Sequence, residues 1–242
     1  MRRKKNGKKK VFIIEIMIFI ILVGFAAFIY VKNDGNKEKE NTGDEDVASE
    51  SSDAAAQAQY DLGNGLIVTR VESYSGPYME DASDEEVSDV MMIYVTNEGE
   101  KTIQYAEVVV EGEEEAVFKI TTLYPGYTMM ALESSRKPYT DVFESISTRN
   151  VAYFQEEPNL YRDVLEVQPL DGGFNITNIS DEDITGEVVV YFKDVKDDVL
   201  WGGITYRGRI EGGIGAGDIR QIMTENFSED TTKVVFITIA EE

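Results

Sequence analysis

Residues 11–31 form an apolar stretch, VFIIEIMIFIILVGFAAFIYV, whose single ionisable residue is Glu15. Its 21 residues would reach ~30 Å as an α-helix, about the thickness of the hydrocarbon core of a bilayer. Residues 1–10 contain seven Lys or Arg and no acidic residue, and such a basic flank stays in the cytoplasm. The stretch is longer than the core of a cleaved signal peptide. The sequence therefore predicts a cytoplasmic segment over 1–10, one uncleaved transmembrane helix over 11–31 and an extracytoplasmic remainder.

Glu15 has two interpretations. It lies about one helical turn beyond Lys10, where it would pair with a lysine at the cytoplasmic interface. Alternatively, if Val11 were the first residue of a processed chain, Glu15 would be the fifth, an arrangement that resembles type IV pilins. That family has Gly before the cleavage site, where this chain has Lys10. Because acidic residues inside membranes are candidates for function, Glu15 is a possible membrane-docking residue.

Charge and composition exclude several classes of function. The net charge is −23, and the first ten residues contribute +7, which leaves −30 for the rest of the chain. Nucleic-acid binding needs a basic surface and is therefore not expected. The chain contains neither Cys nor His, so it has no Ser-His-Asp triad, Cys nucleophile or His-ligated zinc. We expect no enzymatic activity and no cofactor. A Cys-free ectodomain is also typical of a bacterial envelope protein, here assigned to a Gram-positive organism.

Residues 32–58 differ in amino-acid composition from the residues that follow them. They are mostly Glu, Asp, Asn, Ser, Lys and Ala, with no aromatic residue. Such a segment cannot bury enough apolar surface to offset the entropy lost on ordering. It is predicted to be a disordered acidic linker between the membrane and a folded part.

From residue 59 onward, short runs rich in β-branched and aromatic residues alternate with turn signals such as Tyr-Pro-Gly and Asp-Gly-Gly. The pattern is typical of antiparallel β-sandwiches. The predicted strands are 66–73, 89–97, 102–112, 116–123, 127–133, 151–155, 163–170, 174–180, 184–195, 199–210, 218–224 and 233–240.

An internal repeat organises these strands. The segment VTNEGEKTIQYAEVVV (95–110) aligns with ITNISDEDITGEVVV (176–190), so that Asn97 matches Asn178 and Ile103 matches Ile184. Further on, LYPGYTMMALES (123–134) parallels GIGAGDIRQIMTEN (213–226). The sequence thus predicts an all-β ectodomain of two tandem Ig-like antiparallel β-sandwich domains, 59–157 and 158–242, preceded by the transmembrane helix.

The second copy resembles the FxLYD-type β-sandwich domain of bacterial envelope proteins. The resemblance is carried by Asn178, by the alternation over 184–192 followed by Asp194, and by the small turn over 215–217. It implies a β-sandwich fold for residues 158–242. Fold alone does not specify an activity.

One strand of the second copy combines the residue types that are enriched in binding hot spots. Trp201, Tyr206, Arg207 and Arg209 lie together in an otherwise acidic region, and we predict them as possible partner-contact residues. In the alternative interpretation, Trp201 and Tyr206 fill the sandwich core.

These observations predict a single-pass cell-membrane protein with a cytoplasmic N-terminus and extracytoplasmic β-domains. Its expected role is non-catalytic binding or scaffolding, with the bilayer and an envelope protein or glycan as partners. An alternative is an accessory subunit of a transport, secretion or pilus-like assembly that docks through its helix. Another is a cation-dependent carbohydrate-active domain, since paired carboxylates are the one remaining catalytic set.

Overall fold

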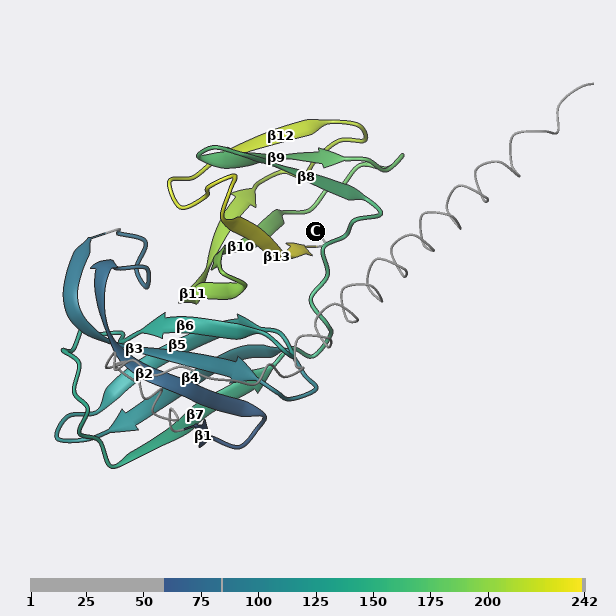
Figure 1. Cartoon of the computed structure of the whole chain (residues 1–242). Coiled ribbons are helices and arrows are strands. Elements are labelled where there is room, and N and C mark those ends of the chain that lie inside the picture. The colour runs from purple at the N-terminus through teal and green to yellow at the C-terminus, as the bar shows by residue number, and fades with distance from the viewer. Residues whose placement is uncertain (1–58, 84, 241–242) are drawn as a thin grey trace, which may run out of the picture. The chain divides into compact units, whose positions relative to one another are not determined.

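The computed structural model describes residues 59–83 and 85–240, and the secondary structure in these ranges is entirely β (Figure 1). This confirms the all-β prediction. The predicted transmembrane helix over 11–31, with Glu15, and the linker over 32–58 lie outside the described residues. Within the described ranges, no helix has the length and apolar character needed to cross a bilayer.

Residues 59–157, the first copy, form two layers of strands. One layer has the order β1-β2-β3-β6 and the other β5-β4-β7. The strands are β1 (Tyr60–Asp61), β2 (Leu66–Pro77), β3 (Glu86–Asn97), β4 (Ile103–Glu111), β5 (Ala116–Leu123), β6 (Thr128–Leu132) and β7 (Ser145–Tyr153).

Residues 158–240, the second copy, repeat this plan. One layer has the order β8-β9-β12 and the other β11-β10-β13. The strands are β8 (Leu165–Leu170), β9 (Gly173–Asn178), β10 (Val188–Lys196), β11 (Val199–Ile210), β12 (Ile219–Met223) and β13 (Thr232–Ile239).

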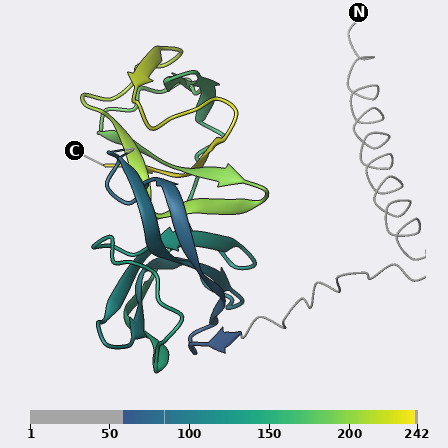
Figure 2. The ribbon, with the colours of Figure 1, turned by 60° about the vertical axis from the view of Figure 1, so that its left-hand side comes forward.

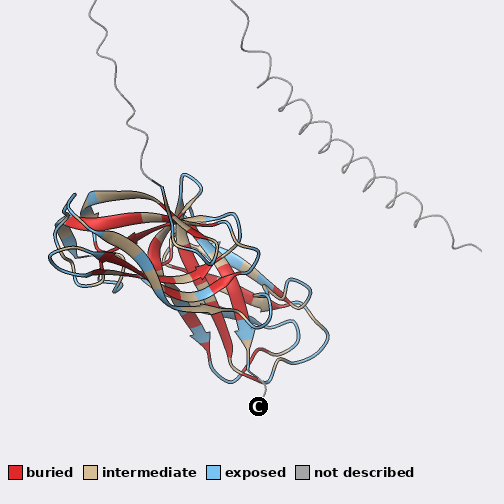
Figure 3. Cartoon of the chain, turned by 90° about the horizontal axis from the view of Figure 1, so that it is seen from below, coloured by how far each residue is buried: buried red, intermediate tan, exposed pale blue. Residues whose placement is uncertain are grey.

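Each copy buries an apolar core between its two layers, which gives the sandwich-like arrangement that the sequence predicted. In the first copy, side chains such as Ile93 of β3 and Phe118 of β5 are fully buried in one cluster. In the second copy, Phe174 of β9 and Phe192 of β10 pack edge to face, with ring centroids 6.1 Å apart. Figure 3 shows the buried residues running along the strands of both copies. Alternating side chains place one face of each strand in these cores.

The matched asparagines occupy the same position in the two copies. Asn97 is fully buried, and its Nδ2 donates hydrogen bonds to the carbonyl oxygens of Lys101 (3.0 Å) and Leu123 (2.9 Å). Its Oδ1 accepts the N–H of Gly99 at 3.0 Å. Each asparagine therefore ties the end of its strand to two loops.

Asn178 makes the equivalent bonds in the second copy. It is fully buried and donates to the carbonyl oxygens of Glu182 (2.8 Å) and Ile214 (3.0 Å). Its Oδ1 accepts the N–H of Ser180 at 3.0 Å. Buried amide groups must find hydrogen-bond partners. Because Asn97 and Asn178 find equivalent partners, they occupy equivalent positions in the two copies.

A parallel pairing joins the copies. Strand β6 of the first copy pairs with β11 of the second, with Met129 opposite Leu200 and Met130 opposite Trp201. The result is one seven-stranded sheet of order β1-β2-β3-β6-β11-β10-β13 that runs through both copies. Figure 2 shows the first copy in blue and teal and the second in green and yellow. Both copies lie in one compact unit.

The outer face of β3 and β6 carries a third apolar cluster. Val90, Met92, Met130 and Leu132 are buried there beneath Tyr78, which precedes β3. Trp201 of the second copy packs against the same cluster. Strand β3 is therefore buried on both faces, which explains its unbroken apolar run from Val90 to Ile93.

Candidate functional site

Two of the predicted contact residues, Trp201 and Tyr206, are half-buried and pack against other parts of the chain. Trp201 packs on the third cluster, and the Nζ of Lys196 lies 4.5 Å from its ring centroid. Tyr206 stacks on Phe192 of the second core with a centroid distance of 5.9 Å. Its hydroxyl donates to the carbonyl oxygen of Met79 at 2.7 Å. Much of the surface of both aromatic side chains is therefore covered by other residues of the chain.

Arg207 and Arg209 are exposed on the same strand. The Nε of Arg209 lies 3.2 Å from an oxygen of Glu187, whereas no partner of Arg207 is found among the described residues. The partner-contact assignment of the four residues remains a prediction, and Glu15 lies outside the described residues.

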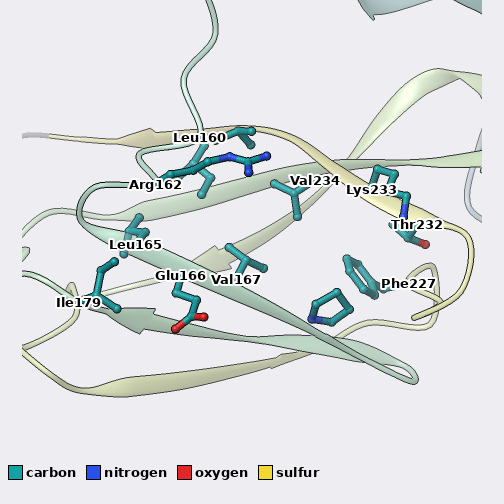
Figure 4. A pocket seen from close by; sticks show the side chains of 12 residues that line it. Leu160, Arg162, Leu165, Glu166, Val167, Ile179, Phe227, Thr232, Lys233 and Val234 are labelled. Atoms are coloured by element: carbon teal, nitrogen blue, oxygen red, sulfur yellow. The ribbon is translucent and has the colours of Figure 1, made fainter. Parts of the chain in front are cut away.

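A cavity of about 540 Å³ opens between β8 and β13, the outer strands of the two layers of the second copy (Figure 4). Most of its lining is apolar, and three of these residues, Leu165, Phe227 and Ile237, belong to the second core. The lining residues are Leu160, Arg162, Leu165, Glu166, Val167, Pro169, Ile179, Phe227, Thr232, Lys233, Val234 and Ile237.

A second cavity, of about 890 Å³, adjoins the first and shares Leu160, Arg162, Lys233 and Val234 with it. It extends past the turn between β5 and β6 of the first copy. The ring of Tyr124 from that turn lies 6.1 Å from the ring of Tyr127, and both line the cavity. We call the two cavities together the β13 groove, because β13 contributes to both.

Two cations of the β13 groove are unpaired. Among the described residues, four cationic side chains make no ion pair, hydrogen bond or ring contact: Lys119, Arg162, Arg207 and Lys233. Two of them, Arg162 and Lys233, are exposed in the groove. In a chain with a net charge of −23, the first cavity thus has two cations and one carboxylate, Glu166, in its lining, whereas the second also contains Asp163 and Asp198.

A pair of opposite charges, the fully buried Lys193 and the half-buried Glu80, lies at the junction of the copies. Lys193 is fully buried and donates to the carbonyl oxygens of Gly202, Gly203 and Ile204 at 3.0, 3.1 and 2.6 Å. Burial lowers the pKa of Lys193 to about 7, while the nearby Glu80 acts in the opposite direction. This lysine is held by the backbone rather than presented to a ligand.

Glu80 approaches the same stretch of β11 from the first copy. Its carboxylate accepts the N–H groups of Gly203 (2.8 Å), Ile204 (3.1 Å) and Leu132 (2.9 Å). Burial raises the pKa of Glu80, and the three backbone hydrogen bonds and Lys193 partly oppose that rise. The pair is therefore a structural link between the copies.

Among the described residues, no group of three acidic side chains is placed to hold a metal ion. The first cavity of the groove offers an apolar lining with two exposed cations, Arg162 and Lys233, which suits a ligand that has an apolar body and a negative group.

The chain matches no protein-family model, no curated protein and no solved structure. The resemblance to FxLYD domains therefore rests on the residues quoted above. The function must be argued from the site itself.

Sequence reasoning missed both the groove and the pair of opposite charges. Arg162 follows Pro158 and Asn159 in a stretch without periodicity, and Lys233 opens a strand, so neither carries a motif. Lys193 did carry a signal, because it interrupts the run VVVYFKDV inside a predicted strand. A lysine at such a position lies either on a face of the sheet that is exposed to solvent or, as Lys193 does, on a face that another part of the chain covers.

Proposed function

We propose that this protein is a non-catalytic, membrane-anchored binding or scaffolding protein of a Gram-positive bacterial envelope. In this proposal, residues 11–31 anchor the chain and residues 59–242 form two tandem Ig-like domains outside the cell membrane. The basic flank at 1–10 and the apolar stretch support the orientation. The repeated asparagine networks at Asn97 and Asn178 support descent of both domains from one unit.

The observation that carries the binding role is the β13 groove. The walls of its second cavity come mainly from the β5–β6 turn, from residues 158–163 and from β13. The pairing of β6 with β11 holds these three parts in one sheet-linked unit. Because the walls of the groove are already in place, little entropy would be lost in ordering them when a ligand binds. This favours a role of the groove in ligand recognition.

The orientation can be tested because the chain has no native Cys. A single cysteine in place of the exposed Ser147 should react with a membrane-impermeant maleimide in intact cells. A cysteine in place of Asn6 should react only after lysis. The reverse pattern would contradict the proposed orientation.

The binding role is tested by site-specific photo-crosslinking of the full chain in intact cells. A photo-reactive phenylalanine analogue replaces Tyr127, which is 52% exposed in the groove, or Val142, which is 73% exposed outside it. Crosslinked envelope components are expected at position 127 and not at position 142. Equal crosslinking at both positions, or none at either, would contradict a binding site in the groove.

A further inference from the structure

The β13 groove penetrates the second copy because its edges are closed differently from those of the first. In the first copy, the preceding segment forms β1, which pairs with β2, and Tyr60 packs edge to face on Phe143 at 5.8 Å. In the second copy, the preceding segment instead bridges β13, where Asn159 lies opposite Ile237. Among the residues that the structure describes, no strand pairs with the outer edge of β8, and the space between the layers remains open to the surface.

The groove has a polar side and an apolar side. Figure 4 shows Arg162 and Lys233 on the same side as Leu160 and Val234, with Glu166 on the opposite wall. The apolar lining between them leads to residues of the second core. A ligand would therefore place a negative group at Arg162 and Lys233 and an apolar body toward the core. A guanidinium group binds carboxylate or phosphate in a bidentate manner, which suits such a head group.

The two strand edges argue against an extended peptide in this position. On β13, the N–H of Ile237 donates to the carbonyl oxygen of Asn159 at 2.8 Å. The carbonyl oxygen of Val235 accepts the hydroxyl of Tyr124 at 2.7 Å. Strand β8 contains Pro169, which has no N–H to give to an added strand. β-Strand addition needs free backbone groups on the edge of the sheet. The groove therefore suits a ligand that binds through a charged group and an apolar body instead of through a peptide backbone.

We infer that the β13 groove binds a single-chain anionic lipid, with its carboxylate or phosphate head group at Arg162 and Lys233 and its aliphatic chain between β8 and β13. This inference names a ligand class for the binding role proposed above and rests on that role. The cavity of about 540 Å³ lies within the ~300–1,000 Å³ of small-ligand sites.

The test uses the full chain in nanodiscs of uncharged phosphatidylcholine and a decanoate that carries a photo-reactive diazirine. Labelled residues are mapped by mass spectrometry. Labelling is expected within 160–167 and 232–237. Unlabelled decanoate and decyl phosphate should compete, and decanol, which has the same chain without the charge, should not.

Three variants assign the labelling to the groove. The double substitution Arg162→Gln with Lys233→Gln removes the two free cations of the groove, and Val167→Trp fills its apolar part. Each should reduce labelling at least tenfold. Lys119→Gln with Arg220→Gln removes two exposed cations outside the groove, so it makes the same change in net charge and should leave labelling unchanged. Matching thermal melts of the four proteins confirm that each is folded.

The results separate this inference from the proposed function. Equal loss of labelling in the two double variants, or competition by decanol as strong as by decanoate, would overturn recognition of a negative head group. If the groove remains unlabelled while position 127 still crosslinks to an envelope component in cells, the lipid assignment is wrong and the binding role stands. If both experiments are negative, both proposals are wrong.

Discussion

Glu80 and Lys193 lie at opposite ends of the same two peptide groups. The N–H groups of Gly203 and Ile204 point to the carboxylate of Glu80, and the carbonyl groups of Gly202 and Gly203 point to the ammonium of Lys193. In a trans peptide the N–H and C=O bonds point in opposite directions, so both peptide dipoles are aligned between the two charges. The first copy thus holds the second through the backbone of β11.

Replacement of Glu80 should weaken this link. Glu80→Ala leaves three partly buried N–H groups without their acceptor and removes the counter-charge of Lys193. We expect a loss of ~2–4 kcal/mol in the free energy of unfolding, measured by urea denaturation of residues 59–242. Glu100→Ala, at an exposed position, is the control and should change it by less than ~0.5 kcal/mol. Similar values for the two variants would contradict the structural role of Glu80.

Lys193 predicts a dependence of stability on pH. Its pKa in the folded protein is about 7, below the ordinary value of 10.5, so the unfolded chain retains a proton that the folded chain has lost between these values. Stability should therefore rise with pH from about 7 toward 10.5. Glu80 acts the opposite way at lower pH, because its raised pKa makes stability fall as pH rises above 4.5.

The measurement is the melting temperature as a function of pH for the wild type and for Lys193→Met. Methionine keeps the apolar stem and removes the titrating group. The wild type should gain several degrees above neutral pH relative to the variant. Parallel curves for the two proteins between pH 7 and 10 would show that Lys193 does not titrate in this range.

The two asparagine networks should contribute similarly and independently. Asn97→Ala and Asn178→Ala each remove two hydrogen bonds donated to carbonyl groups and one accepted from a backbone N–H group. Each should cost ~2–3 kcal/mol, and the aspartate variants should cost more, because a carboxylate cannot donate to those carbonyls. Asn175→Ala, on the same strand as Asn178, is the matched control and should be nearly neutral. A double variant that loses no more than either single variant would contradict independent networks.

Gly203 is placed where no side chain fits. A Cβ atom there would lie 1.9 Å from the carbonyl oxygen of Lys119 in the first copy. Gly203→Ala should cost at least ~3 kcal/mol and increase amide exchange in β5 and β11. Gly126→Ala serves as control, because Gly126 has φ of +79° but nothing within 4 Å of an added Cβ. It should cost only ~1–2 kcal/mol, and a similar cost for both variants would argue against close contact of the copies.

Local patterns in the sequence predicted much of the fold. The alternation over 116–123 became β5, and the Asn97 and Asn178 turns form where the repeat placed them. Strand β7 was predicted only over 151–155, whereas it begins at Ser145, because its early residues carry little apolar character. The two-residue β1 was missed altogether, since a pairing that short has no periodicity.

Contacts between the copies could not be predicted in this way. The pairing of β6 with β11 joins residues about seventy positions apart and has no local signal. Within its own strand, Lys193 resembles a surface residue. The residues that cover it, Glu80 and its neighbours, belong to the first copy and are distant in the sequence. The β13 groove depends on where residues 158–163 cross the sandwich, which also depends on the distant strand β13.

The join between β6 and β11 makes the two copies unequal partners, although they share one plan. In the first copy β6 has a neighbour on each side, whereas its counterpart β12 is the outer strand of its sheet within the described residues. The two copies therefore contribute different surfaces to their contact, as the subunits of a heterodimer do. The first copy supplies β6, and the second supplies β11. If the two copies were produced as separate chains, the paired edges of β6 and β11 would be exposed, and Glu80 and Lys193 would lose each other until the copies bound again.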